Sequence, residues 1–551
     1  MTDILLVQPP IRDFYLTKKR TIPYGLGCIA SALLNHGFSV EIFDALATFR
    51  SREIEPTEDM AFLRKYYGEP DISPFALFHK YRHYGYSFEH IGKVARSSGA
   101  FLVGISSLFT PYGDEALKTA ETVRAFHPDC KIVLGGHHPT VLPSRVMANR
   151  AVDFILRGEG EGSMPLLARA VKDGGDFHSI PGIVFRNHHG EILANDPAST
   201  AEPKDYLPPA THLIRHSFYR RAGRGSMVVV ASRGCPLRCT YCSVGASSYL
   251  KYRRRPVEAV IAEIEKGVTH HDARFIDFED ENLSMDRKWF LGLLQEIRNR
   301  FEPFGLELRA MNGLFPDSLD EETVRAMKQA GFRTLNLSLG STSKEQLDRF
   351  QRPDVRKAFD HGLVLAEKYG LEVVGYIIAG GPFQNPQHSL EDLLFLARRR
   401  VLAGISIFYP SPGSADYELC RSLNLLPSSF SLMRSSALPL SHTTSRDDSA
   451  TLLRLGRILN FMKYLIDRDA GIPAPAKPEK WIDTQDKRIE TGKKLLQWFL
   501  FDGKIRGARP DGPVFEHHVS PQLAEAFLEN LSRMRIQGVT RTGAEIITSF
   551  T

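Results

Sequence analysis

Three cysteines, Cys235, Cys239 and Cys242, stand close together in the segment SRGCPLRCTYCS. Cysteine thiolates ligate iron–sulfur clusters, commonly four to a cluster, and three would leave one iron open to another ligand. A structural zinc site is the alternative, but zinc takes a fourth Cys or His at characteristic spacing, which His216 and His270 do not have. The pattern therefore predicts a [4Fe-4S] cluster held by these three thiolates.

The remaining composition is that of an ordinary globular chain. The 551 residues carry a formal net charge of +6, which is small for this length and does not indicate a nucleic-acid partner. The other cysteines, Cys28, Cys130 and Cys420, are scattered, so we expect them to pack as small apolar residues. The N-terminus lacks a signal-peptide pattern, and no apolar run reaches the roughly 18 residues that span a membrane. We therefore expect a cytoplasmic protein without a membrane span.

Strand and helix patterns alternate along residues 1–200, which predicts an α/β domain of Rossmann-like fold. Strands are expected at 3–8, 39–44, 101–106 and 131–134. Such sheets bind ligands beyond the carboxyl ends of their parallel strands. Residues 46–100 interrupt the pattern with aromatic and charged side chains. We expect a helical insertion there, which either covers a pocket or only packs against the sheet.

Three further segments follow this domain. The proline-punctuated residues 201–224 are expected to form a linker. Repeated strand and helix patterns over 225–430 predict a full or partial (β/α) barrel. Residues 431–551 contain amphipathic helical patterns and are expected to form a mainly helical domain. No catalytic side chain is assigned from these patterns.

The cysteine segment and the strands after it resemble the radical S-adenosylmethionine (SAM) superfamily over about residues 225–415. The resemblance implies that SAM chelates the open iron through its amino and carboxylate groups. Tyr241 matches the aromatic residue that lies against the SAM adenine, and Glu279 or Asp280, in FEDENL, matches the acidic turn near the SAM amino group. Carboxylates at such a turn also cap helices, which is the structural alternative.

Two later segments extend the resemblance. The run IAGGPFQ resembles the IxGxPxE turn beside the adenine, which implies a place there for Ile378 and Gly380, with Gln instead of the usual acid. The run NLSLGSTS lacks the Glu of the ESGS-like turn, which reaches the SAM ribose in many relatives. The ribose contact then falls to Asn336, Ser338 or Ser341.

Residues 1–160 resemble the cobalamin-binding domain that precedes many radical SAM modules. Its matching pieces follow predicted strands, where glycine lets the backbone approach a large flat ligand. The residues expected at cobalamin are Gly104, Ser106, Gly135, Gly136, His138 and Gly158. The DxHxxG signature, whose histidine ligates cobalt from below, is absent, so the lower ligand is not assigned. We expect His138 to shape the loop around the cobalamin tail, and an ordinary loop histidine or a domain without ligand are the alternatives.

Together the two resemblances imply a cobalamin-dependent radical SAM enzyme. In such an enzyme a reduced cluster cleaves SAM to a 5′-deoxyadenosyl radical, which abstracts hydrogen from an unactivated carbon, and methylcobalamin donates a methyl group. The alternatives are a non-methylating cyclase of the magnesium-porphyrin ester type and a non-catalytic cobalamin- or cluster-binding protein. A methylthiotransferase is disfavoured because its N-terminal domain needs three cysteines and only Cys28 and Cys130 are present. The implied partners are a small-molecule substrate, which the sequence does not name, and a reductant such as flavodoxin or ferredoxin.

Overall fold

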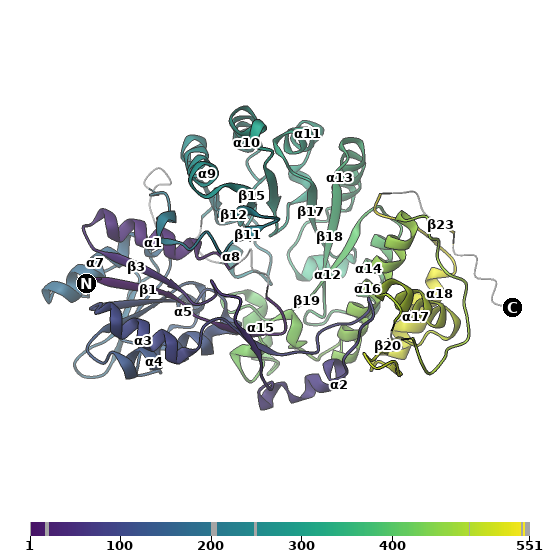
Figure 1. The fold of residues 1–551 in the computed structure, drawn as a ribbon, viewed down its shortest axis with the longest axis horizontal. Coiled ribbons are helices and arrows are strands. Elements are labelled where there is room, and N and C mark those ends of the chain that lie inside the picture. The colour runs from purple at the N-terminus through teal and green to yellow at the C-terminus, as the bar shows by residue number, and fades with distance from the viewer. Residues whose placement is uncertain are drawn as a thin grey trace.

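The computed structural model describes residues 2–16, 21–199, 206–246, 251–483, 485–540 and 544–545. Three parts follow one another across the molecule in Figure 1: a purple and blue sheet domain, a teal barrel and a group of yellow-green C-terminal helices. Residues 201–205 of the expected linker lie outside the described residues.

Within the described residues, a seven-stranded sheet forms the centre of the N-terminal part, in the order β10-β9-β8-β7-β6-β1-β3. The strands are β1 (Ile4–Gln8), β3 (Val40–Asp44), β6 (Leu102–Ser106), β7 (Lys131–Gly135), β8 (Phe154–Leu156), β9 (Ile183–Arg186) and β10 (Ile192–Ala194). The strands β3, β1, β6, β7 and β8 are parallel, and β9 and β10 add an antiparallel edge.

Helices cover both faces of this sheet. They are α1 (Tyr24–Asn35) and α7 (Gly160–Asp173) on one face, and α3 (Phe88–Ser98) and α4 (Gly113–Phe126) on the other. Because successive side chains of a strand point to opposite faces, Ile4 and Leu6 pack toward the first pair and Leu5 and Val7 toward the second. The expected α/β sheet with helices on both faces is confirmed.

The expected helical insertion over 46–100 is wrong in two respects. Helix α3 belongs to the regular crossover from β3 to β6, and the true insertion is residues 45–87, here called the strap, which leaves and rejoins the sheet where Tyr86 N donates to Ala45 O (2.9 Å). The strap contains only short elements: β4 (Ser51–Glu53), η2 (Glu58–Leu63), α2 (Arg64–Tyr67) and β5 (Arg82–Tyr84), the strands pairing in the order β2-β5-β4 with β2 (Ile11–Asp13).

The physical reason lies in where the aromatic side chains of the strap are buried. Tyr67, Phe75 and Tyr81 belong to the same apolar core as the barrel and the C-terminal helices. Tertiary packing therefore decides the local structure, and a helical period is not required. In Figure 1 the strap runs below the barrel toward the C-terminal helices, with α2 at its lower edge.

Within the described residues, six parallel strands make a partial barrel: β12 (Arg224–Val229), β15 (Ala273–Phe278), β16 (Glu307–Ala310), β17 (Thr334–Gly340), β18 (Glu372–Ala379) and β19 (Leu402–Ile407). Parallel bridges Leu308–Phe332 and Leu314–Leu337 connect the β16 region to β17. The outer layer contains α9 (Val257–His271), α10 (Arg287–Phe301), α11 (Glu321–Ala330), α13 (Arg356–Tyr369) and α14 (Pro386–Ala397).

The C-terminal part adds helices against one end of the barrel. They are α16 (Arg446–Asp467), α17 (Arg488–Asp502) and α18 (Pro521–Leu531), with the hairpin of β20 (Arg506–Ala508) and β21 (Val514–Glu516). Helix α16 begins with a capping box in which Ser445 and Asp448 satisfy each other's backbone N–H groups. Its apolar side chains share the barrel core. No helix among the described residues is both long and apolar enough to cross a lipid bilayer.

Candidate active site

The carboxyl ends of the sheet strands and of the barrel strands meet in one region. In the sheet, Ser106 pairs with Gly135, and Gly135 pairs with Leu156, so β6, β7 and β8 end at one edge. Helix α5 (His137–Val141) follows β7 at that edge. On the barrel side, a β-carbon placed on Gly413, after β19, would lie 2.9 Å from Val141 Cγ1 and 3.8 Å from Ser243 Cβ.

The cysteine segment begins at the carboxyl end of β12 and is held by Asp280, which follows β15. Its carboxylate accepts hydrogen bonds from Ala231 N (3.2 Å), from Ser232 N and from Ser232 Oγ (2.6 Å). Burial raises the pKa of Asp280 to about 7, although these three hydrogen bonds favour the carboxylate. Asp280 therefore fixes the start of the loop.

The loop itself folds back tightly. Cys242 N donates to Cys239 O (3.0 Å), and a β-carbon on Gly245 would lie 2.3 Å from Leu237 O. Thr240 ties the middle of the loop to the barrel, since its N donates to Phe350 O (3.0 Å) and its Oγ1 donates to Asp416 Oδ2 (3.1 Å). This backbone needs glycine at position 245 and holds the cysteines on one short turn.

The three cysteines suit an iron–sulfur cluster by their chemistry. All are free of disulfides; Cys239 is buried, and Cys235 and Cys242 are partly exposed. Burial raises the pKa of Cys235 and of Cys242, so the protein alone favours the thiols, whereas a bound metal deprotonates its thiol ligands. Among the described residues, no three His, Cys, Asp or Glu side chains are close enough to hold a single metal ion. Three soft thiolates from one loop match the donor set of an iron–sulfur cluster.

A buried arginine that the sequence analysis missed connects the loop to β17. Arg352 Nη1 donates to Tyr241 OH (2.9 Å) and to Cys239 Sγ (3.8 Å), and Nη2 donates to Ser338 O (2.6 Å) and Ser338 Oγ (2.8 Å). A β-carbon on Gly340 would lie 2.7 Å from Arg352 Nε, so glycine makes room for this side chain. No pattern in the sequence marks Arg352, because only the fold places it beside the cysteines.

Several residues expected around SAM are close together. Tyr241 packs in an apolar cluster with Ile378, and its ring meets Phe350 edge-on at 5.0 Å between centroids. Ser338 is linked to Tyr241 through Arg352. These contacts gather expected residues from the cysteine loop, β17 and β18.

Other expected residues have structural partners of their own. Ser341 is buried and its Oγ donates to Asp392 Oδ2 (2.8 Å), while Asn336 Oδ1 accepts from Tyr376 OH (3.2 Å). Both oxygens of Asp280 are engaged as described, and Glu279, one residue earlier, is partly exposed. The ribose and amino contacts of SAM stay predictions.

The turn after β18 is closed by the glutamine that replaces the usual acid. Gln384 Oε1 accepts from Gly381 N (2.9 Å), and Gln384 Nε2 donates to Ile378 O (2.9 Å). Gly380 has a φ of +80°, which favours glycine. The side chain of Gln384 therefore shapes the turn from within.

The glycines expected at cobalamin fall into two groups. Three have steric reasons within the fold: a β-carbon would lie 2.7 Å from Leu6 Cδ2 at Gly104, 2.6 Å from Ser107 O at Gly136 and 2.1 Å from Ala198 O at Gly158. Gly135 is different, because a β-carbon there would meet no atom within 4 Å. It ends β7 beside Ser106 of β6, so there is open space at Gly135, at the carboxyl end of the strand.

This edge suits a large flat ligand. Leu108 and Phe109, which follow β6, are 54% and 55% exposed, an unusual position for large apolar side chains. They provide an apolar surface next to the open backbone at Gly135. The sheet also reverses its strand order between β1 and β6, which is where such folds bind ligands.

His138 is enclosed in the protein. It is fully buried and neither ring nitrogen has a partner among the described residues. The Phe430 ring lies edge-on at 4.8 Å between centroids, and a β-carbon on Gly113 would lie 2.5 Å from Nε2. Burial lowers the pKa of His138 to about 4, so the imidazole is neutral at pH 7.

Comparison with known proteins identifies both parts. Residues 229–396 match the radical SAM superfamily and residues 77–168 match the B12 binding domain. The chain is 25% identical over 343 residues to an uncharacterized methyltransferase of Pyrococcus horikoshii, covering 62% of this chain and 73% of that protein. It is 25% identical over 427 residues to the cytidylyl-2-hydroxyethylphosphonate methyltransferase of Streptomyces wedmorensis, covering 71% and 75%.

Solved structures share the fold. The cobalamin-dependent SAM radical enzyme OxsB, with aqua-cobalamin and SAM bound, superposes with a TM-score of 0.63 at 15% identity, covering 91% of this chain and 72% of that chain. The radical SAM methyltransferase TsrM of Kitasatospora setae gives a TM-score of 0.58 at 18% identity, covering 77% and 79%. The chain is therefore a radical SAM enzyme that also carries a B12 binding domain, with a [4Fe-4S] cluster, SAM and cobalamin as its cofactors.

Proposed function

We propose that this enzyme transfers a methyl group to an unactivated carbon of a small-molecule substrate. The observation that carries the proposal is that the cysteine loop lies beside the edge of the B12 binding domain. Ser243, the neighbour of Cys242, accepts from Ser411 Oγ (3.3 Å), and Gly413 packs on Val141 of α5. One substrate bound between the two edges would face both cofactors.

When bound, the reduced cluster with SAM supplies a carbon-centred radical, and cobalamin supplies the methyl group. The residues of this chain position these groups. Cys235, Cys239 and Cys242 hold the cluster, and Asp280 fixes the start of their loop. Arg352 orients the Tyr241 hydroxyl, and the open space at Gly135 would receive the cobalamin.

Relatives of known name support methylation. In addition to the two methyltransferases above, the hopanoid C-3 methylase of Methylococcus capsulatus is 25% identical over 309 residues, covering 55% of this chain and 57% of that protein. All three names refer to methyl transfer, and the two that state a substrate, a cytidylyl phosphonate and a hopanoid, differ in it.

A second candidate is cyclisation without methyl transfer. It is favoured by a match to the anaerobic magnesium-protoporphyrin IX monomethyl ester cyclase of Rubrivivax gelatinosus, 27% identical over 322 residues, covering 57% of each chain. Under this alternative the same residues would hold the cofactors, and the reaction would differ in the fate of the substrate and in the products formed from SAM.

The products formed from SAM distinguish the two. The protein would be reconstituted without oxygen with iron, sulfide and cobalamin, reduced, and supplied with SAM. A methylase yields both 5′-deoxyadenosine and S-adenosylhomocysteine, whereas a cyclase yields 5′-deoxyadenosine alone. A protein with alanine in place of all three cluster cysteines is the control and should yield no 5′-deoxyadenosine. Absence of S-adenosylhomocysteine from the intact enzyme would refute methyl transfer.

We also propose a flavodoxin or a ferredoxin as the electron donor and the cytoplasm as the compartment. The cluster must be reduced before it acts, and a reducing compartment keeps its cysteines from forming disulfides. Titration of the oxidised cluster with reduced flavodoxin, followed by electron paramagnetic resonance, tests the donor.

A further inference from the structure

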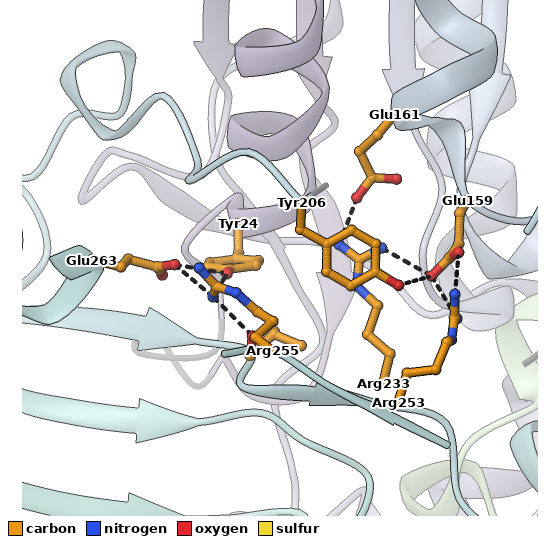
Figure 2. Close-up of polar contacts among 9 residues, drawn as sticks. Tyr24, Glu159, Glu161, Tyr206, Arg233, Arg253, Arg255 and Glu263 are labelled. Carbon is orange, nitrogen blue, oxygen red and sulfur yellow. Dashed lines mark hydrogen bonds and ion pairs between the residues drawn. The ribbon is translucent and has the colours of Figure 1, made fainter. Parts of the chain in front are cut away.

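A group of buried ion pairs joins the B12 binding domain to the stem of the cysteine loop (Figure 2). Arg233 Nη1 donates to Glu159 Oε1 (2.9 Å), and Arg233 Nη2 donates to Glu161 Oε1 (2.5 Å). Arg253 binds the same Glu159 with two nitrogens, at 2.9 and 3.0 Å. The glutamates belong to the segment RGEGE, at the start of α7, and the arginines belong to the radical SAM domain.

The geometry of this group differs from that of surface ion pairs. The side chains of Glu159, Arg253 and Arg233 are 7%, 13% and 19% exposed. The Arg233 guanidinium also lies 4.3 Å above the centre of the Tyr206 ring, as Figure 2 shows. Exposed pairs contribute little because solvent screens them, whereas breaking a buried pair leaves an uncompensated charge.

The path from these ion pairs to the cluster ligands is short. Arg233 pairs with Arg253 in the two-stranded sheet of β13 (Ser232–Arg233) and β14 (Arg253–Arg254). Only Gly234 separates Arg233 from Cys235, and Gly234 N donates to Glu281 Oε2 (3.2 Å). A shift of Arg233 would therefore also move Cys235, because the one residue between them is itself hydrogen-bonded.

On the other side, the path to the cobalamin edge is equally short. Glu159 follows Gly158. The backbone N of Gly158 donates a hydrogen bond to Thr140 Oγ1 of α5 (3.0 Å), which restrains the backbone at this point. Helix α5 begins directly after Gly136 at the carboxyl end of β7. The ion pairs thus connect the open edge of the sheet to the cysteine loop through two short, hydrogen-bonded segments.

A second buried contact supports the same stem. Arg255 Nη1 binds Glu263 Oε2 (2.7 Å) of α9 and donates to Tyr24 OH (3.2 Å) at the start of α1. The segment from Arg253 to Arg255 is therefore attached to the N-terminal part of the molecule at two separate points, near α7 and near α1.

We propose that Glu159 and Glu161 are positioning residues that hold the cysteine loop at a set separation from the cobalamin-binding edge. The proposal rests on the proposed function in one respect, that both cofactors serve one substrate. It gives the RGEGE segment a role distinct from ligand contact, since both carboxylates are directed at the arginines of the other domain.

The first test uses the protein without cofactors. Hydrogen–deuterium exchange of amides 230–242 would be compared between the wild type and the variant Glu159→Gln with Glu161→Gln. We expect exchange at least about threefold faster in this stretch, because the loop stem loses its fixed partner. Arg287→Gln on α10, which removes exposed ion pairs with Asp320 and Glu322, is the matched control and should leave the stretch unchanged.

The second test measures the separation between the cofactor sites. In the reconstituted, reduced protein, a nearby cluster speeds the electron-spin relaxation of cob(II)alamin, an effect that falls steeply with distance. We expect the double variant to bind iron and cobalamin as the wild type does and to lose most of this enhancement. Glu161→Gln alone, which breaks one contact, provides the same readouts should the double variant not fold.

Neither readout depends on methyl transfer, so an enzyme that methylates nothing would still show both. Unchanged exchange at 230–242 together with unchanged relaxation in a folded variant would overturn the positioning role. If the wild type forms no S-adenosylhomocysteine from SAM, only the proposed methyl transfer is refuted.

Discussion

Replacement of Asp280 by alanine should weaken both the fold and the binding of the cluster. The carboxylate accepts from Ala231 N, Ser232 N and Ser232 Oγ, and Asp280 and both donor residues are buried. In the variant the serine hydroxyl can turn to another partner, but the two backbone N–H groups cannot. A buried donor without a partner costs about 1–3 kcal/mol, so two cost about 2–6 kcal/mol.

That cost is large against the roughly 5–15 kcal/mol by which proteins are stable. Urea denaturation of the cofactor-free protein at pH 7.5, followed by circular dichroism, measures it. Asp317→Ala is the control, since Asp317 is exposed and such changes stay within about 0.5 kcal/mol. Asp280→Asn keeps one acceptor oxygen and should fall between the two.

Cluster binding gives a second measurement on the same variant. Because Asp280 fixes the residues just before Cys235, we expect Asp280→Ala to hold less iron after anaerobic reconstitution than the control. If Asp280→Ala unfolds at the same urea concentration as Asp317→Ala and holds as much iron, the carboxylate does not anchor the loop.

Three further changes test other parts of the site. Cys239→Ala should abolish the cluster absorbance and bound iron while leaving circular dichroism unchanged, and wild-type iron content would contradict the assignment. Burial lowers the pKa of His138 to about 4, below the 6.5 of the unfolded chain. Between these values the unfolded chain binds a proton that the folded protein does not bind, so the free energy of unfolding is highest above pH 6.5 and falls on acidification toward pH 4. This predicts a loss of about 2 kcal/mol between pH 7.5 and 5, which His138→Gln should remove in urea titrations at both pH values. Gly158→Ala should destabilise the protein by more than about 2 kcal/mol, because φ is +82° and the new β-carbon would meet Ala198 O, and an unchanged melting temperature would refute this.

The sequence predicted the parts of the molecule that follow local rules. Alternating strands and helices gave the sheet and the barrel, since a strand period of two and a helix period of 3.6 are visible in the residues. The spacing of Cys235, Cys239 and Cys242 indicated their chemistry because all three lie within one turn. The domain boundaries at 200, 225 and 430 stay predictions.

The sequence could not show contacts made across long stretches of chain. Arg352 lies 113 residues from Cys239, and Glu161 lies 72 residues from Arg233, so only the fold brings them together. The residues 46–100, which include most of the strap, were expected to form a helical insertion. The burial of the strap's aromatic residues against the barrel core, which no local period reveals, gives the strap its irregular backbone.

The strap is translated early, but several of its partners are translated near the end of the chain. Asp71 binds His517 (2.9 Å), Ile72 N donates to Ala508 O (3.0 Å), and Arg454 donates to Tyr66 O (2.9 Å), so its partners leave the ribosome more than 380 residues later. At roughly 5–20 residues per second, about 20–90 seconds pass before the strap can dock. During that interval Tyr67 and Phe75 lack the C-terminal part of the apolar core that they share in the complete fold. The strap can therefore complete its packing only after the last helices of the chain have been translated.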